Sequence, residues 1–327
     1  MVVGGSLIFE SERRGQIREL GFRSDAGWTV ANVSSRCADW FDGYAMADGL
    51  AHQQSPVPTL WGVRNDGVLL GFTYAPEEQV GGWHQHTTDG IFESVCVVPE
   101  GGEDIVYLVA LRTIGGTPLR YIERMAERQF ATLADRRFVG SHLTFDGVNT
   151  TATTITITGG TTYVAGQTVT LTASAATFAY PATTDVGDRI KWLGSYAVRI
   201  TATSSTTVAT GVIVDSFPAV PASPSAVWTW GRDTVAGLSH LEGKLVQVVA
   251  DGVVLAPQTV ASGAISLRAK GTGATVVAYK VHVGLGYTAE AVTMPPAIPV
   301  DGLGHGRAGS PSHAHLRLRR SAPFRFG

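Results

Sequence analysis

The sequence predicts an all-β protein, and three observations support this prediction. Thr, Val, Ala and Gly are abundant, and residues that favour long helices are few. Short runs of β-branched and aromatic residues recur along the chain, separated by Asp-Gly turns. The middle of the chain alternates Thr with aliphatic residues, which is the two-residue period of a strand with one solvated face.

Composition limits the classes of protein that fit. With 327 residues, two or three folding units are expected. The net charge of −2 gives no overall attraction to nucleic acid or to anionic membranes. No apolar run is long enough to span a bilayer, and the N-terminus does not resemble a signal peptide. Cys37 and Cys96 are too few for a disulfide framework, so we expect buried free thiols in a reducing cytoplasm.

Residues 1–147 are predicted to form a propeller-like or meander β region. Its first elements are two strands joined by a polar loop, Ser6–Glu10 and Ile17–Phe22, and then a strand fragment at Trp28–Val30. A helical turn or short helix is expected at Asn32–Trp40.

The segment Thr59–Val98 predicts four consecutive antiparallel strands, which is the spacing of a propeller blade or a β-meander. Their expected ranges are Leu60–Arg64, Val68–Tyr74, Val80–His86 and Phe92–Val98. The preceding segment, Asp48–Pro58, is predicted to be a connector because Pro56 and Pro58 are unsuited to a central strand.

Three more strands are expected before residue 147, at Ile105–Arg112, Leu119–Glu123 and Phe138–Phe145. Between the last two, Met125–Asp135 contains helix formers, and an irregular link is almost as well supported as a helix.

The composition then changes. Thr150–Ala176 is almost entirely Thr, Ala, Gly, Val and Ile, with alternation at Thr154–Ile157 and Val169–Thr172. Residues 148–232 are therefore predicted to form a Thr-rich β module, a small barrel or a sandwich. Disorder is the alternative for such low complexity, but the regular alternation favours folding. The Pro-rich segment Phe217–Pro224 is the expected exit linker.

Residues 233–293 are predicted to form a small SH3-like β-barrel. Strands are expected at Leu245–Val249 and Val253–Leu255 around the Asp251-Gly252 turn, and also at Ile265–Leu267 and Lys280–Val283.

Residues 294–327 form a Pro/Gly-rich basic tail. From Asp301 onward the tail holds one acidic residue and five arginines, which are Arg307, Arg317, Arg319, Arg320 and Arg325. Contact with DNA phosphates is one interpretation. The other, which we favour, is that Leu316–Arg319 is a terminal strand that pairs within an assembly.

Two groups of residues have the chemistry of a site. His84 and His86 lie two apart on an expected strand, so both face the same way, and Asp89 and Glu93 are the nearby candidates for further metal ligands. A third convergent ligand is not evident from the spacing, so hydrogen-bonded structural histidines are favoured. Asp89 and Glu93 also resemble a glycosidase carboxylate pair, but turn chemistry explains Asp89.

The sequence contains no nucleophile elbow, zinc-protease helix, P-loop or Cys-x-x-Cys motif. We therefore predict no enzyme activity, no catalytic residue, no cofactor and no metal. Four arginines alternate with aromatic and acidic residues and are expected to form salt bridges, with Glu123 and Asp66 among the partners, or contacts between subunits. They are Arg64, Arg112, Arg120 and Arg124.

Several motifs in this order resemble the nozzle family of short-tailed bacteriophages, also called tail tubular protein B. The first is W-x-V-R-x-D-G-x-L-L-x-F-T-Y-x-P-E-x-x-V-x-G-W-H-x-H at Trp61–His86, followed by T-D-G-x-F-E-S-V at Thr88–Val95 and R-Y-I-E-R at Arg120–Arg124. G-L-x-H-L-E-G-x-x-V-x-V-x-A-D-G-x-V follows at Gly237–Val254, and V-H-V-G-L-x-Y at Val281–Tyr287. The resemblance runs from Ile8 to Thr293 and omits residues 148–232, which it therefore marks as an insertion.

The resemblance implies the C-terminal portion of a structural virion protein from a phage or prophage. It implies a homohexameric ring around the DNA exit channel, docked on a tail adaptor protein and carrying tail fibres. DNA would pass without sequence-specific binding, and no stable membrane insertion is expected. The expected location is the virion tail, assembled in the bacterial host cytoplasm. The alternative is a host-surface glycan-binding or glycan-degrading module. It is suggested by the Thr-rich insertion and by four tryptophans expected at the surface, Trp83, Trp192, Trp228 and Trp230.

Overall fold

The computed structural model describes residues 1–12, 15–78, 80–127, 130–219, 221 and 223–291. The chain divides into two compact units, Met1–Gly286 and Tyr287–Gly327. The protein is mostly β, with 51% strand and about 5% helix, which confirms the predicted class. In the described ranges, no helix combines the length and apolar character needed to cross a membrane. The predicted basic tail lies outside the described residues.

The N-terminal sheet contains four antiparallel strands in chain order. They are β1 (Val2–Val3), β2 (Ser6–Glu10), β3 (Ile17–Arg23) and β4 (Gly27–Asn32), followed by the 3-10 helix η1 (Ser35–Trp40). The two predicted strands, the strand fragment and the helical turn are therefore confirmed. Short 3-10 turns elsewhere are η2 (Pro76–Glu78), η3 (Leu133–Asp135) and η4 (Ser239–Leu241).

The middle sheet has the order β5-β6-β7-β8. Its strands are β5 (Met46–Gln53), β6 (Thr59–Arg64), β7 (Leu69–Ala75) and β8 (Val80–His86). The prediction that Asp48–Pro58 is a connector was wrong for its first half. Strand β5 ends at Gln53, before both prolines, and a register shift between Met46 and Leu50 accommodates the residues between them.

The third sheet has the order β11-β10-β9, with strands β9 (Ile91–Glu100), β10 (Glu103–Ile114) and β11 (Thr117–Arg124). The prediction that the Phe92–Val98 strand continues the preceding meander was therefore wrong, because β9 belongs to this separate sheet. Packing explains the difference. Phe92 and Val95 on β9 pack against Trp61, Val63 and Leu69 of the middle sheet, which needs a second covering layer.

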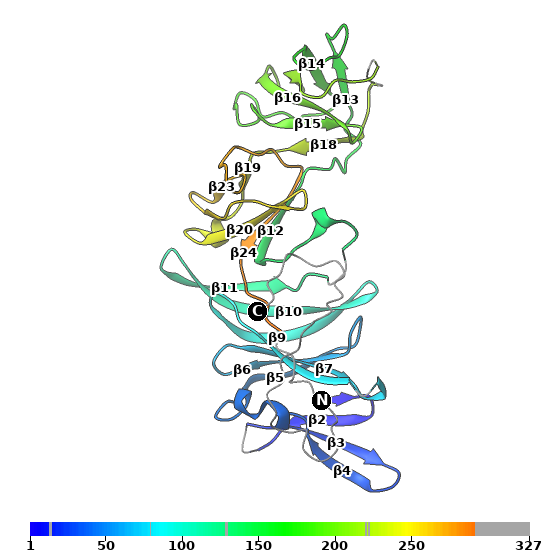
Figure 1. Cartoon of the computed structure of the whole chain (residues 1–327), viewed down its shortest axis with the longest axis vertical. Helices are drawn as coiled ribbons and strands as arrows, with labels where there is room; N and C mark the ends of the chain where they lie inside the picture. The colour runs from blue at the N-terminus through cyan, green and yellow to red at the C-terminus, as the bar shows by residue number, and fades with distance from the viewer. Residues whose placement is uncertain (13–14, 79, 128–129, 220, 222, 292–327) are drawn as a thin grey trace, which may run out of the picture. The chain divides into compact units, whose positions relative to one another are not determined.

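The three sheets are stacked face to face, as the ribbon in Figure 1 shows. All six residues of β6 are buried, because this strand is covered on both sides. Leu60 and Leu70 face the core shared with Ile8 of the N-terminal sheet. Trp61 and Val63 face the core shared with the third sheet. The alternation of side chains along one strand thus joins three layers.

The C-terminal β region contains one five-stranded sheet and one two-stranded sheet. The larger sheet contains β12 (Gly140–Asp146), β24 (Lys280–Leu285), β20 (Leu245–Ala250), β21 (Val253–Val254) and β22 (Gln258–Thr259). The smaller pairs β19 (Thr234–Ala236) with β23 (Ala264–Ser266). The predicted Asp-Gly turn is present, with φ of 47° at Asp251 and 83° at Gly252. Before β12, the described part of Met125–Asp135 forms no helix longer than η3.

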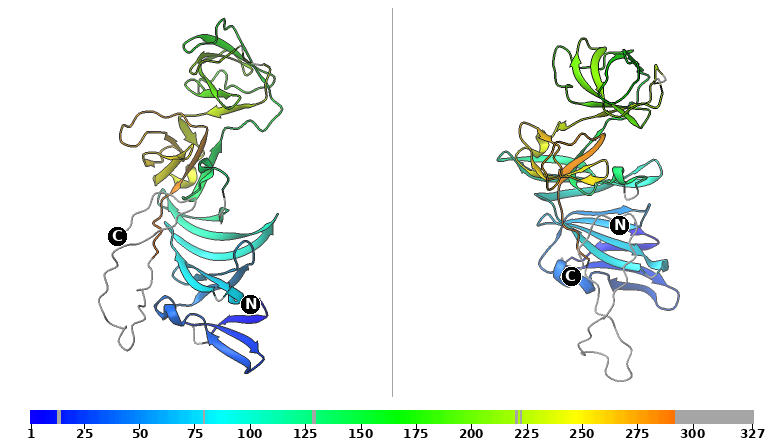
Figure 2. Two further views of the ribbon diagram at one scale, coloured as in Figure 1. Left: turned by 45° about the vertical axis from the view of Figure 1, so that its right-hand side comes forward. Right: turned by 45° about the horizontal axis from the view of Figure 1, so that its top comes forward.

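The Thr-rich module is one six-stranded, curled antiparallel sheet of order β13-β14-β17-β16-β15-β18, which Figure 2 shows from two directions. Its strands are β13 (Ile155–Thr158), β14 (Thr168–Ala173), β15 (Arg189–Trp192), β16 (Tyr196–Thr203), β17 (Val208–Ile213) and β18 (Trp228–Gly231). Ile155 and Leu171 are buried inside the curl, and the alternating threonines lie outside it. The module therefore folds, as the alternation predicted, and is not disordered.

The chain enters and leaves the module at adjacent points. The Trp230 amide donates a hydrogen bond to the Gly147 carbonyl over 2.7 Å, and Val148 pairs with Thr229. A Cβ at Gly147 would lie 1.8 Å from the Trp230 carbonyl oxygen, so this close approach requires glycine. Strand β12 immediately precedes this crossing and pairs with β24, so the C-terminal sheet contains strands from both sides of the module.

Candidate functional site

A buried arginine organises the Thr88-Asp89-Gly90 turn. The Arg112 side chain is 1% exposed, and its Nε and Nη2 donate to the two carboxylate oxygens of Glu123, each over 2.8 Å. Its Nη1 donates to Thr88 Oγ1 over 2.8 Å and to the Asp89 carbonyl over 2.6 Å. A guanidinium taken out of water is stable only when such partners surround it. Arg112 therefore fixes the turn between the middle and third sheets.

Gly90 completes this turn. Its φ of 126° lies where residues with a side chain are strained, and a Cβ would be 2.2 Å from the Leu111 carbonyl oxygen. Local contacts thus explain each residue of the T-D-G motif. The Thr88 hydroxyl and the Asp89 carbonyl accept hydrogen bonds from Arg112, and Gly90 leaves room for the backbone of β10.

The candidate carboxylate pair is divided between two cations. The Asp89 carboxylate lies 2.8 Å from Lys244 Nζ in the C-terminal β region. Glu93 accepts two hydrogen bonds from Arg120, over 2.6 and 3.0 Å, and these bonds lower the pKa of Glu93. A glycosidase acid needs a carboxyl whose pKa is raised, so the geometry favours a structural role for both residues.

The two acidic partners predicted for the arginines, Glu123 and Asp66, both form salt bridges. Arg112 pairs with Glu123, and Arg64 pairs with Asp66, with Nε donating to Oδ1 over 2.9 Å. The Arg64 guanidinium also donates to the Trp40 carbonyl over 2.7 Å and lowers the pKa of Asp66.

The other two arginines form exposed pairs across the third sheet, Arg120 with Glu93 and Arg124 with Glu100. Exposed pairs of this kind add little to stability. Contact with another subunit stays a prediction for all four arginines.

His84 and His86 lie on one face of β8, as predicted. His84 Nδ1 and His86 Nε2 are 2.8 Å apart, so one nitrogen donates to the other. The imidazoles contact the Trp61 ring, with centroids 5.5 and 5.6 Å away. Gly71 lies between Trp61 and His84 in the strand register, and its missing side chain leaves room for these contacts. Within the described ranges, no group of three His, Cys, Asp or Glu residues is placed to hold a metal ion.

Both cysteines are free, but only one is even partly buried. Cys37 is half-buried, and burial raises the pKa of its thiol. Cys96 is exposed, so the prediction that both are buried was wrong. Val95 and Val97 face the core, and Cys96, between them, faces the opposite side of β9. Because the run Val95–Val98 is apolar on both faces of the strand, the sequence does not show which of its residues face the core.

The tryptophans expected at the surface are mostly internal. Trp192 is 0% exposed, and Trp228 and Trp230 are also buried in the core of the Thr-rich module. Trp83 is half-buried, and its ring stacks on that of Phe72 with centroids 4.6 Å apart. Its indole N–H donates to the Val33 carbonyl. The prediction of exposed aromatic side chains at these four positions was therefore wrong.

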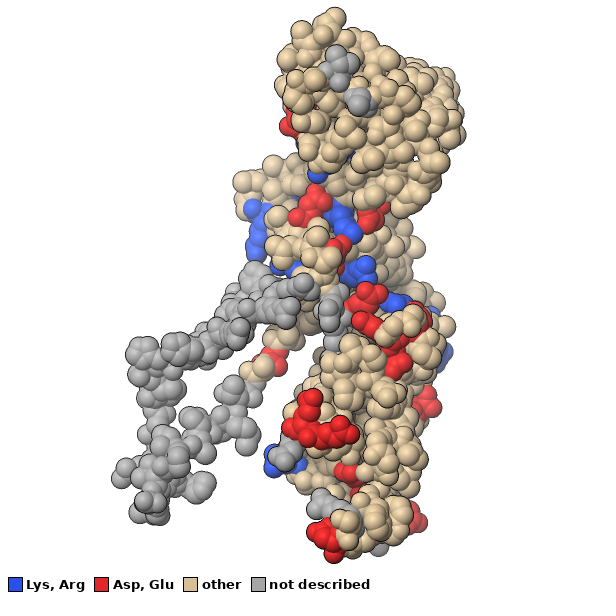
Figure 3. Space-filling model, turned by 90° about the vertical axis from the view of Figure 1, so that its right-hand side faces the viewer, with Lys and Arg blue, Asp and Glu red and all other residues tan. Residues whose placement is uncertain are grey.

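The Thr-rich module presents a largely uncharged surface. Residues 148–232 contain only three acidic and four basic residues. In the view of Figure 3, the part of the surface formed by this module is almost free of Lys, Arg, Asp and Glu.

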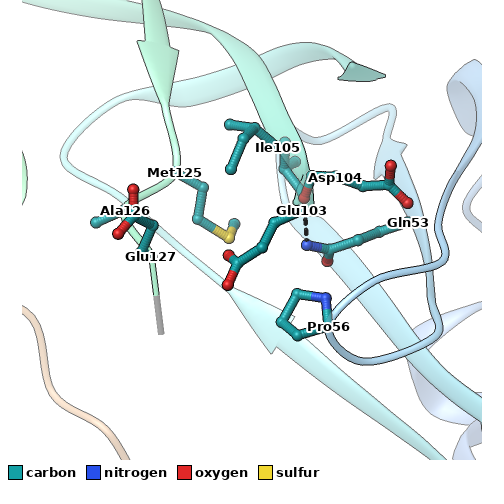
Figure 4. Close-up of a pocket in the computed structure, with 9 residues that line it drawn as sticks. Gln53, Pro56, Glu103, Asp104, Ile105, Met125, Ala126 and Glu127 are labelled. Atoms are coloured by element: carbon teal, nitrogen blue, oxygen red, sulfur yellow. Dashed lines mark hydrogen bonds between the residues drawn. The ribbon is translucent and has the colours of Figure 1, made fainter. Parts of the chain in front are cut away.

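A shallow pocket between the middle and third sheets is lined by Gln53, Asp104 and two further carboxylates, Glu103 and Glu127 (Figure 4). Gln53 Nε2 donates to the Asp104 carbonyl over 2.7 Å, and Gln53 Oε1 accepts from the Trp61 indole. The Asp104 carboxylate accepts from the amides of Gln54 and Ser55. These contacts fix the end of β5 against the start of β10.

An exposed apolar surface lies on the N-terminal sheet. One face of this sheet packs on the middle sheet, and we call the opposite side the outer face. Phe22 and Trp28 there are 65% and 68% exposed. Their rings meet edge to face, with centroids 5.5 Å apart. Beside them, one apolar residue from each strand forms a row in register, consisting of Val2, Leu7, Leu20 and Val30. Contiguous exposed apolar surface is typical of an interaction site.

The third sheet also exposes apolar side chains. Ile122 on β11 is 80% exposed, and Ile91 and Val98 on β9 are each 41% exposed. The sequence contained a signal for both surfaces that the prediction missed. Runs such as Leu7-Ile8-Phe9 are apolar on both sides of the strand, although only one side faces the core.

The chain matches no protein-family model, and no curated protein is similar to it.

Proposed function

We propose that this chain is a structural subunit of the tail nozzle of a short-tailed phage or prophage, forming a ring around the DNA exit channel. The observation that carries the proposal is the ordered set of motifs from Trp61 to Tyr287. The geometry supports it because these motifs fall on residues that fix the fold. Trp61 packs in the core between the middle and third sheets, Thr88–Gly90 binds Arg112, and Asp251-Gly252 forms a hairpin turn.

The proposal includes a finer description of the fold. The three stacked sheets are part of a β-propeller, in which sheets pack face to face around an axis. The C-terminal β region is a small SH3-like barrel. The Thr-rich module, whose entry and exit points are hydrogen-bonded neighbours, is an insertion into it.

Assembly accounts for the exposed apolar surfaces. Phe22 and Trp28 on the outer face, and Ile122 on the third sheet, cost free energy while they stay in water. Burial between subunits removes this cost, and permanent assemblies have large apolar interfaces. A net charge of −2 suits a conduit, because a strongly basic wall binds phosphates and retains DNA.

The partners in this proposal are other copies of the chain in a hexameric ring, a tail adaptor protein and tail fibres. DNA passes through without sequence-specific contacts, and the protein is not inserted stably in a membrane. The chain performs no catalysis and needs no cofactor. It is located in the virion tail after assembly in the host cytoplasm.

The role of the outer face is tested by the variant Phe22→Ser/Trp28→Ser. The mass of the full chain, with the adaptor protein present, is measured by light scattering. We expect a multimer for the wild type and a shift to smaller species for the variant. The matched control is Tyr180→Ser, which changes a side chain of 51% exposure on the Thr-rich module and leaves the mass unchanged. A wild type that stays monomeric at high concentration contradicts the proposal.

The alternative function is glycan binding or glycan cleavage by a tail-associated module. Burial of Trp192, Trp228 and Trp230 removes one of the two features that suggested it, and the Thr-rich module is the other. Binding or hydrolysis of host polysaccharides by the full chain would favour this alternative over the nozzle.

A further inference from the structure

Arg232 connects the Thr-rich module to the C-terminal β region. It directly follows β18, and its backbone exchanges two hydrogen bonds with Ala278, each of 2.9 Å. Its side chain turns back to the module. Its Nη2 lies 4.0 Å from Asp185 Oδ1, and its Nε lies 3.6 Å from Asp188 Oδ2. One side chain therefore links the two regions where the chain crosses between them.

Both carboxylates are buried, with Asp185 at 4% and Asp188 at 5% exposure. Asp188 Oδ2 accepts a hydrogen bond from the Trp230 indole over 2.8 Å. Asp185 Oδ2 accepts one from the Ala179 amide over 2.7 Å. The guanidinium also lies over the rings of Phe145 and Trp230, at 5.7 and 5.6 Å. The cluster thus includes side chains from both regions.

The charges of this cluster do not balance when both carboxylates are ionised. Two carboxylates then face one guanidinium, and Asp233 adds a further negative charge nearby. The Arg232 side chain is 43% exposed, so water screens the cation more than the two buried carboxylates. Its Nε atom is buried without a hydrogen-bond partner among the described residues, because 3.6 Å is too long for a hydrogen bond. A buried excess charge is costly, and binding one proton removes it.

We propose that Asp185, Asp188 and Arg232 form a proton-sensitive latch between the Thr-rich module and the C-terminal β region. The latch is closed when Asp188 carries a proton and one carboxylate balances Arg232. It loosens when both carboxylates are charged, so the module is held more tightly at mildly acidic pH than at neutral pH.

The latch requires that the folded protein favour the protonated form of Asp188, which means a raised pKa. Burial raises the pKa of Asp188 to about 6, and the negative charges of Asp185 and Asp233 act in the same direction. The Trp230 hydrogen bond and the Arg232 charge oppose the rise. Because the pKa in the folded protein lies above its ordinary value of 3.8, the proton stabilises the closed state. This contribution is complete below about pH 4 and is lost as the pH rises through about 6.

The first test is the indole ¹⁵N–¹H resonance of Trp230 in the full chain, assigned with Trp230→Phe and followed against pH. We expect a titration with a midpoint near 6 in the wild type and none in Asp188→Asn, which keeps the hydrogen-bond acceptor without the charge. The control Asp215→Asn removes an exposed carboxylate of the same module and keeps the titration.

The second test is hydrogen exchange of the Trp230 and Arg232 amides, corrected for the intrinsic effect of pH. If opening exposes Asp188, protection falls about tenfold between pH 5 and pH 7 in the wild type. It changes little in Asp188→Asn. A wild-type midpoint near the ordinary aspartate value, or equal protection at both pH values, overturns the proposal. Both outcomes are measured on the wild type, so they do not depend on the folding of a variant.

Discussion

Arg112 is a buried charged residue that holds the turn between the middle and third sheets in place. It is nearly fully buried, and its three donor groups reach Glu123, Thr88 and the Asp89 carbonyl. One side chain therefore holds together the β8–β9 turn, strand β10 and strand β11. A buried charge of this kind is costly to leave unpaired, which makes the cluster sensitive to changes in any member.

The first prediction concerns this cluster. Arg112→Gln leaves the Glu123 carboxylate without its cation, so we expect the free energy of unfolding to fall by about 3 to 5 kcal/mol. The control Arg120→Gln removes an exposed ion pair and is expected to cost less than about 1 kcal/mol. Urea denaturation followed by tryptophan fluorescence measures both. Equal effects of the two changes would show that Arg112 is not the centre of the turn.

The second prediction concerns the backbone of the same turn. Gly90→Ala places a Cβ against the Leu111 carbonyl at an unfavourable φ, so we expect a loss of at least about 2 kcal/mol. Gly102→Ala, in the turn at the other end of β9, meets no atom within 4 Å and is expected to change stability by less than about 0.5 kcal/mol. Thermal unfolding of both variants tests the comparison, and a tolerated Gly90→Ala would contradict this explanation of the T-D-G motif.

At this scale the sequence predicted contacts well where they are local. The Arg64–Asp66 pair lies within one hairpin, and His84 and His86 share a face because they are two apart on a strand. It failed where burial depends on distant packing. Cys96 lies in the apolar run Val95–Val98 and is exposed, whereas Trp192 directly follows Lys191 and is fully buried.

Most elements were predictable, but their arrangement in sheets was not. Local alternation and turn residues located β6, β7 and β8 within a residue or two. Strand β9 belongs to the third sheet because its apolar residues pack on an apolar face of the middle sheet. That assignment requires knowledge of how all three sheets pack on one another. Likewise, β12 pairs with β24 across more than a hundred intervening residues, and no local pattern specifies such a partner.

The third prediction concerns the Thr-rich module as an element. Because Gly147 and Trp230 are hydrogen-bonded neighbours, a short Gly/Ser linker can replace residues 148–229 without moving β12. We expect the shortened chain to stay folded, with the circular dichroism of a β protein and a cooperative unfolding transition. Loss of the transition would show that the C-terminal β region depends on the module for stability.

The fourth prediction concerns the β12–β24 pair. His282 is fully buried, its Nε2–H donates to the Ala134 carbonyl, and its Nδ1 accepts from the Thr144 hydroxyl. Burial lowers the pKa of His282, so the unfolded chain binds its proton more readily than the folded protein. This contribution to stability is present above the ordinary pKa of 6.5 and is lost as the pH falls below it.

The measurement is the urea midpoint of wild type and His282→Gln at pH 7.5 and pH 5.5. The wild type should lose more stability on acidification than the variant. Comparing the two proteins cancels the opposite contribution of Asp188, which favours low pH. A variant with the same pH dependence as the wild type would assign the effect to another group, such as half-buried His142, whose pKa is also lowered by burial.

At the scale of the whole molecule, the exposed apolar faces and the ordered motifs lead to the same proposal. Residues that fix the fold account for the motifs, and the proposed assembly would bury Phe22, Trp28 and Ile122, which are exposed in the single chain. The sequence predicted the β class and the folded Thr-rich module, but it did not indicate which strand faces stay exposed. Such faces depend on how many sheets cover one another, a property of the stack and not of any strand.

The measurement that tests the central claim most directly is electron microscopy of the purified chain with the proteins of the adjoining tail. The nozzle proposal predicts rings with a central hole, docked coaxially on the adaptor protein. Dispersed single chains under conditions where the adaptor itself assembles would contradict it.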